Sequence, residues 1–152
     1  MDIQDTQPEI PKGRSKDEIQ QREKFIKDFY AKWIAVNPEK RIYNTHLQAF
    51  IYVRFLSFQE TTEKAARSYK STLAVTYLTE ILERAQTVNF SKPKIGNKKQ
   101  SRFSDLIIMQ YYKKSFGKIK LTVGILRGSK EKIQYCITAI EKTNVQPATI
   151  TQ

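Results

Sequence analysis

The chain has 152 residues and a formal net charge of +12, and 39% of its residues are hydrophobic, including eight tyrosines, eight phenylalanines and one tryptophan. This composition supports one domain with a real core, while a single cysteine excludes an intramolecular disulfide and one cysteine with one histidine argues against a zinc site. The sequence starts without the apolar run of a secretory signal, and its longest apolar runs are far shorter than the roughly 18–20 residues of a membrane span. We therefore expect a soluble, cytoplasmic protein with no metal, no cofactor and no membrane partner.

The first predicted element is a helix that begins at Ser15, after a polar and flexible segment at residues 1–15. Ser15 and Glu18 have the spacing of a capping box, in which two side chains satisfy each other's free backbone N–H groups. Apolar residues recur at helical spacing as far as Val36, and Pro38 disfavours helical backbone at the residue before it. The pattern predicts one helix from Ser15 to about Val36.

The segment 42–58 is compatible with two structures. Its apolar residues fit helical spacing at Leu47, Phe50, Ile51, Phe55 and Phe58. The stretch from Ala49 to Leu56 is also rich enough in β-branched and aromatic residues for a strand. The length of the segment favours a helix.

A further helical region is predicted from Ser57, which forms a second capping-box pattern with Glu60. We expect a break near Ser71 and, beyond it, an amphipathic face that ends near Gln86. A short strand is expected at Thr87–Phe90.

Residues 91–104 follow as a predicted basic loop. Their sequence, SKPKIGNKKQSRFS, holds five positive charges, no acidic residue, one proline and one glycine. Such a composition is typical of a mobile loop. The next stretch, Leu106–Ile140, predicts three antiparallel strands.

Two turns set the expected register of these strands. With hairpin loops at 115–117 and 128–130, every cross-strand pair on one face is apolar. The pairs are Ile107–Ile125, Met109–Val123, Tyr111–Leu121, Ile125–Ile133, Val123–Tyr135, Leu121–Ile137 and Ile119–Ala139. This face is expected to lie against the helices.

The opposite face then carries polar and basic side chains and is expected to be open. Its rows are Tyr112, Lys120 and Thr138; Gln110, Thr122 and Cys136; and Ile108, Gly124 and Gln134. The predicted fold is α+β, with about three N-terminal helices packed on one face of a C-terminal antiparallel meander of three to four strands. It forms a single domain at residues 16–142, followed by a flexible tail at 143–152.

Positive charge is concentrated in the C-terminal part of the chain. Residues 91–142 contain thirteen Lys and Arg against three acidic residues, so +10 of the net +12 lies there. This asymmetry favours a polyanionic partner, and lysines beside an exposed tyrosine suit RNA or single-stranded nucleic acid. The expected contact residues are Tyr112, Lys114, Lys118, Lys120, Arg102, Arg127, Lys92, Lys94, Lys98 and Lys99.

Two other functions fit the same surface. The basic half could bind an acidic protein, with Leu106, Ile108 and Leu126 forming an apolar contact or a dimer interface. It could also cleave RNA without a metal ion. The sequence leaves the oligomeric state open.

No catalytic residue can be assigned from the sequence. His46 is the only imidazole and lies near the start of a predicted helix, where capping or packing is expected. Cys136 has no histidine near it in sequence to activate it. The carboxylates at 60, 63, 80 and 83 are interleaved with Lys and Arg, as in ordinary surface pairs on helices.

The order of elements resembles a known family. A helix that ends in TEILERAQTV (79–88), then a polar loop, then GKIKLTVGILR (117–127) and EKIQYCITAI (131–140) are similar to the barnase-like part of phage and mobile-element polyvalent proteins. These belong to the superfamily of metal-independent ribonucleases that includes barnase, EndoU and RelE. The resemblance covers residues 57–140 and implies an active face on the side of the sheet away from the helices. It implies Tyr112, Lys120 and Arg127 as the residues to suspect.

Overall fold

The computed structural model describes residues 9–141. In chain order its elements are α1 (Lys16–Val36), β1 (Arg41–Asn44), β2 (Ala49–Tyr52), α2 (Phe55–Ala65), α3 (Tyr69–Val75), α4 (Leu78–Arg84), β3 (Gln86–Ser91), β4 (Phe103–Lys113), β5 (Gly117–Leu126) and β6 (Lys132–Ala139). The predicted tail at 143–152 and the first eight residues of the predicted N-terminal segment lie outside the described residues.

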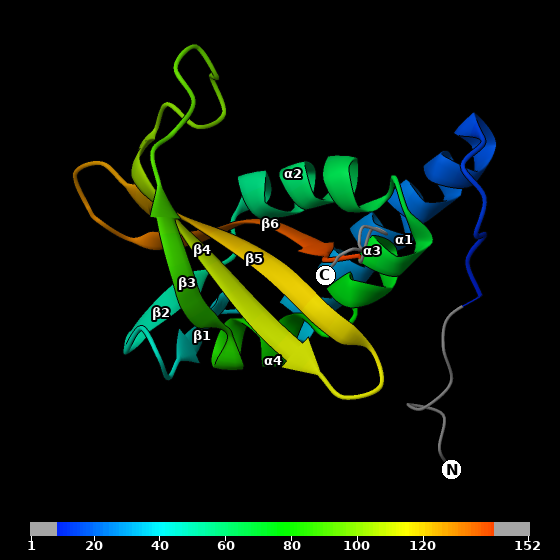
Figure 1. The fold of residues 1–152 in the computed structure, drawn as a ribbon, viewed down its shortest axis with the longest axis horizontal. Coiled ribbons are helices and arrows are strands. Elements are labelled where there is room, and N and C mark those ends of the chain that lie inside the picture. The colour runs from blue at the N-terminus through cyan, green and yellow to red at the C-terminus, as the bar shows by residue number, and fades with distance from the viewer. Residues whose placement is uncertain (1–8, 142–152) are drawn as a thin grey trace, which may run out of the picture.

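One six-stranded mixed sheet runs through the described part of the chain, in the order β1-β2-β6-β5-β4-β3. β2 and β6 pair in parallel, and the other neighbours pair antiparallel. In Figure 1, α1 runs behind the strands, and α2 and α4 lie above and below β4 and β5. The predicted antiparallel meander of three to four strands is therefore wrong. The sheet is larger, contains a parallel pair and includes a hairpin that precedes three of the helices in the chain.

That hairpin takes up residues 41–52, so the helix predicted for the segment 42–58 is wrong except at residues 55–58, which begin α2. Asn44 is buried at the turn, where its Oδ1 accepts hydrogen bonds from the backbone N–H groups of His46 and Leu47. Its side-chain amide donates to two carbonyls at the end of α4. Gln48 completes the turn with a φ of +54°. Strands of four residues are too short for alternation to outweigh a chance helical spacing of aromatic residues.

The first helix agrees with its prediction at both ends. Ser15 Oγ accepts from the Glu18 N–H, and the Glu18 carboxylate accepts from the Ser15 N–H, which is the expected capping box. The helix ends at Val36, before Pro38. Its buried face, with Ile26, Tyr30 and Trp33, forms part of the main core.

The region after the hairpin divides into three helices instead of two. The predicted cap at Ser57 is wrong, because α2 begins two residues earlier and Ser57 Oγ accepts from the Arg54 N–H within the first turn. The predicted break near Ser71 is displaced, because α2 ends at Ala65, Ser68 caps α3 and Ser71 lies inside α3. The strand expected at Thr87–Phe90 is confirmed within β3.

The β4–β5 pairing keeps the predicted faces but not the predicted register. Met109 pairs with Leu121 and Ile107 with Val123, two residues away from the expected partners. The turn lies one residue earlier than expected, because Lys113 pairs with Gly117, and Ser115 takes a φ of +70° within it. A slip of two residues returns every side chain to its own face, so the alternation of the sequence is satisfied by either register.

A bulge in β6 changes the faces on which the residues before Cys136 lie. The pairing is as predicted from Ile119–Ala139 to Thr122–Cys136, and then shifts so that Val123 pairs with Gln134. Gln134, expected on the open face, is instead fully buried under the helices. Its Oε1 accepts from the Tyr30 hydroxyl at 2.7 Å, and its amide donates to Thr61 Oγ1 at 2.9 Å. Burial of an amide requires such partners.

We expect Tyr30→Phe to lower the free energy of unfolding by about 1–3 kcal/mol, because it leaves the buried Gln134 Oε1 without its donor. Urea denaturation followed by circular dichroism measures this change. Tyr43→Phe is the control, since the Tyr43 side chain is 46% exposed. Equal effects of the two substitutions would contradict the proposed network.

A second, smaller apolar cluster covers one end of the opposite face. It consists of Leu56, Phe103, Leu106, Ile133 and Tyr135. Leu106, Gly124 and Ile133 form one row across three strands, next to the row that faces the main core. The Phe103 ring lies directly on Gly124, where a Cβ atom would come within 2.6 Å of three ring carbons. The face predicted to be open is therefore open only beyond this cluster.

Candidate functional site

A groove of about 390 Å³ lies on the open part of this face. Its floor is formed by side chains of β4, β5 and β6, among them Ile108, Thr122 and Cys136, which pair in one row across the strands. α2 forms one wall, because β2 pairs with only the first two residues of β6, and α2 and then α3 pack along the rest of that strand. The second wall is the basic segment 92–102, which connects β3 to β4.

Four lysines surround this groove. Lys120 rises from the floor, Lys92 and Lys94 belong to the basic segment, and Lys64 belongs to α2. Three of them were predicted as contact residues, and the fold brings them together from positions that are up to 28 residues apart in the sequence. Lys92 also forms an ion pair with Asp105 at 2.7 Å, but its side chain remains 80% exposed. The groove therefore combines a floor of mixed apolar and polar side chains with a rim that carries several lysines.

The basic segment is fastened to α2 through Lys99. The Lys99 ammonium lies 3.1 Å from a Glu60 carboxylate oxygen and 2.9 Å from one of Glu63. Hydrogen bonds to Glu63 and Glu60 raise the pKa of Lys99, and the Lys99 hydrogen bond lowers the pKa of Glu63. Lys99 was expected to contact a ligand directly, but in this structure its charge is directed at the protein's own helix.

Glu60 is a residue whose position the sequence interpretation missed. It was treated as a surface carboxylate, yet it is only 4% exposed and lines the groove. Its other oxygen lies 3.9 Å from the Lys64 ammonium. The available signal was its position four residues after Leu56, which places both side chains on one stripe of α2. Lys64, four residues further, follows the same stripe and was missed for the same reason.

Cys136 lies on the groove floor with its thiol largely buried. Burial raises the pKa of Cys136 to about 12, and the nearby Glu60 carboxylate acts in the same direction. The thiol therefore stays protonated at neutral pH and is a poor nucleophile. Its position on a strand is as the sequence predicted.

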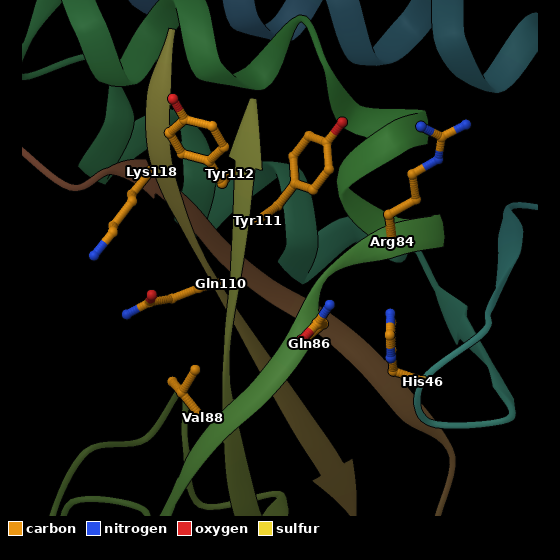
Figure 2. Close-up of a pocket in the computed structure, with 8 residues that line it drawn as sticks. All are labelled: His46, Arg84, Gln86, Val88, Gln110, Tyr111, Tyr112 and Lys118. Atoms are coloured by element: carbon orange, nitrogen blue, oxygen red, sulfur yellow. The ribbon is translucent and has the colours of Figure 1, made fainter. Parts of the chain in front are cut away.

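A second depression, of about 500 Å³, lies toward the C-terminal end of β4, where β3 begins beside it at Gln86 (Figure 2). Tyr112 pairs with Lys118 across β4 and β5, and both point to the same side of the sheet as Lys120. Tyr112 is 66% exposed. Tyr111 and Arg84 project to the other side of β4 in Figure 2. The Tyr111 hydroxyl donates to Glu80 at 2.8 Å, which also binds Lys113, so this side is internally paired.

The other predicted contact residues line neither the groove nor the second depression. Arg102 lines a shallow pocket near the start of α2, and the neighbouring Arg127 donates through its Nε to the Ser101 carbonyl. Lys98 and Lys114 are exposed in turns. His46 is exposed in the β1–β2 turn and lines the second depression, instead of lying near the start of a helix as expected.

Within residues 9–141, no three His, Cys, Asp or Glu side chains are grouped so that they could hold a metal ion. In the same residues, no helix combines the length and apolar character needed to cross a membrane. Comparisons of the chain with protein-family models, curated proteins and solved structures found no match.

Proposed function

We propose that the protein binds nucleic acid, RNA or a single strand, along the open face of its sheet. The observation that carries this proposal is the convergence of Lys64, Lys92, Lys94 and Lys120 around one groove whose floor mixes apolar and polar side chains. Clustered lysines neutralise phosphates, and between them Ile108 can contact an unstacked base while Thr122 and Thr138 can form hydrogen bonds with it.

The face continues from the groove to the second depression in a way that matches an extended strand. Lys120 and Lys118 are alternate residues of β5 and lie about 6.6 Å apart, close to the spacing of successive phosphates. Tyr112 stands beside Lys118 and exposes a ring on which a base can stack. From Ile108 to Tyr112 the open face spans about 13 Å along β4, or about two phosphate spacings.

The proposal predicts affinity that depends strongly on salt. With the four groove lysines and Lys118 each contacting one phosphate, the logarithm of the association constant should fall with the logarithm of salt concentration with a slope of about −3.5. Fluorescence anisotropy with labelled single-stranded RNA and DNA oligonucleotides of two to twelve nucleotides, in EDTA, measures this slope. Affinity should rise with length up to about six nucleotides, the shortest oligonucleotide with five linking phosphates, and then level off.

Two results would overturn the proposal. One is absence of binding to any oligonucleotide at 50 mM salt. The other is binding whose affinity does not change between 50 mM and 500 mM salt, because contacts that release no counterions are not contacts to phosphate. A stable complex with a polyglutamate peptide in place of nucleic acid would instead favour an acidic protein as partner.

A further inference from the structure

We infer that Lys99 is a positioning residue, which holds the basic segment against α2 so that Lys94 stays over the groove. This inference rests on the proposed function, because it concerns how that same site is kept in shape. It assigns Lys99 a role different from direct contact with a ligand.

Lys99 is fastened to α2 at two points. Its ammonium contacts two carboxylates of that helix, at 3.1 Å and 2.9 Å, and one of them belongs to the nearly buried Glu60. The positive charge of a lysine that pairs with two carboxylates is already compensated, so such a lysine should add little to the affinity for a phosphate. The neighbouring Lys98 is exposed and does not line the groove, which makes it a matched control in the adjacent position.

The segment that Lys99 fastens has its own internal order. The Asn97 Oδ1 accepts from the Gln100 N–H, and the Gln100 Oε1 accepts from the Lys94 N–H at 2.7 Å. These bonds make residues 94–100 one small unit. An anchor at Lys99 therefore also fixes the position of Lys94. The Lys99 side chain pairs with α2, whereas the Lys94 side chain lines the groove.

The two ends of the segment have anchors of their own, since Lys92 pairs with Asp105, Arg127 donates to the Ser101 carbonyl and Gln100 is nearly buried, but the tip has few contacts. Ile95 is fully exposed at the tip. Gly96 has a φ of +85°, and a Cβ atom at this position would have no neighbour within 4 Å. In Figure 1 the segment extends away from the sheet, beside α2. Loss of the Lys99 ion pairs should therefore let the tip move away from the groove and take Lys94 with it, whereas the ion pair with Asp105 keeps Lys92 in place.

The test compares Lys99→Gln with Lys98→Gln, which remove the same charge from adjacent positions. We expect Lys99→Gln to weaken binding of a single-stranded oligonucleotide about eightfold at 50 mM salt and to make the salt slope about 0.7 less negative, the effect of losing the phosphate contact of Lys94, which was not mutated. Lys98→Gln should change affinity less than threefold. Lys99→Arg, which keeps the charge, should bind as the unmodified protein does. Equal effects of Lys99→Gln and Lys98→Gln would overturn the inference.

A substitution on α2 provides a second test, because general charge attraction and loss of the anchor predict opposite changes in affinity. Glu63→Gln removes a negative charge, so general electrostatic attraction would strengthen binding, whereas loss of the Lys99 anchor should weaken it about threefold. Glu39→Gln makes the same change of charge at an exposed carboxylate paired with Arg41 and should not weaken binding. Tighter binding by Glu63→Gln would contradict the positioning role.

Hydrogen exchange separates this inference from the proposed function. In Lys99→Gln the backbone N–H groups of residues 94–100 should exchange faster, while those of β4 and β5 should not change. If the unmodified protein binds no nucleic acid but this local acceleration occurs, the proposed function fails and the anchor remains. Unchanged exchange at residues 94–100 means that Lys99 holds nothing in place.

Discussion

Simultaneous replacement of Lys94 and Lys120 by glutamine should weaken binding of single-stranded nucleic acid about 65-fold at 50 mM salt. The two lysines stand on opposite parts of the groove, one on the basic segment and one on β5. Each phosphate contact of a single strand adds about 0.7 to the salt dependence, so lowering salt from 1 M to 50 mM is worth about eightfold per contact. Anisotropy titrations at several salt concentrations should therefore also show a slope about 1.4 less negative.

The matched control for this variant is Lys24→Gln with Lys32→Gln on α1. These lysines are exposed and line none of the depressions on the sheet, and their replacement lowers the net charge by the same amount. The control should bind within about twofold of the unmodified protein. If both double variants weaken binding equally, the attraction depends on total charge and the groove is not the site.

Phe103→Ala should lower the free energy of unfolding by about 3–5 kcal/mol. The Phe103 side chain is fully buried in the second apolar cluster, where its ring packs edge to face on Tyr135 with the ring centres 5.6 Å apart. Removing the ring leaves a cavity between the start of α2 and the sheet, which the rigid strands cannot close. Guanidinium denaturation measures the loss, and Phe90→Ala is the control because Phe90 is 62% exposed on β3.

Gly124 provides a second measurement of the same contact. Gly124→Ala alone should destabilise the protein by about 1–3 kcal/mol, since the new methyl group meets the Phe103 ring at 2.6 Å. In the Phe103→Ala background, Gly124→Ala should lower the free energy of unfolding much less, because the new methyl group partly fills the cavity. A cycle in which the two effects simply add would show that the ring does not lie on Gly124.

The parts of the fold that the sequence predicted are those set by local chemistry. The capping box of Ser15 and Glu18 fixed the start of α1, and alternation along β4 and β5 placed Met109 and Leu121 on the core face. The same alternation could not detect a slip of two residues, because such a slip preserves both faces. It also could not detect the bulge before Cys136, where one extra residue turns Gln134 into the core.

The candidate site was predicted in part for the same reason. Lys92, Lys94 and Lys120 could be suspected from their charge, but nothing local indicates that Lys99 turns away from them toward α2. Glu60 and Lys64 became part of the site only because α2 packs along β6, a contact between segments about seventy residues apart. The burial of Glu60 follows from that packing and cannot be deduced from a pattern of interleaved charges.

The position of β6 has a consequence for the kinetics of folding. It is the last strand in chain order within residues 9–141, yet it lies third in the sheet and joins the β1–β2 hairpin to the rest. The parallel pair of β2 and β6 cannot form until Ile51 meets Lys132, which lies about eighty residues later in the chain. Closing so long a loop is slow compared with forming the β4–β5 hairpin. During synthesis on the ribosome, the β1–β2 hairpin and α1 would therefore be exposed without their neighbour, and this early half of the chain is where a chaperone would be needed most.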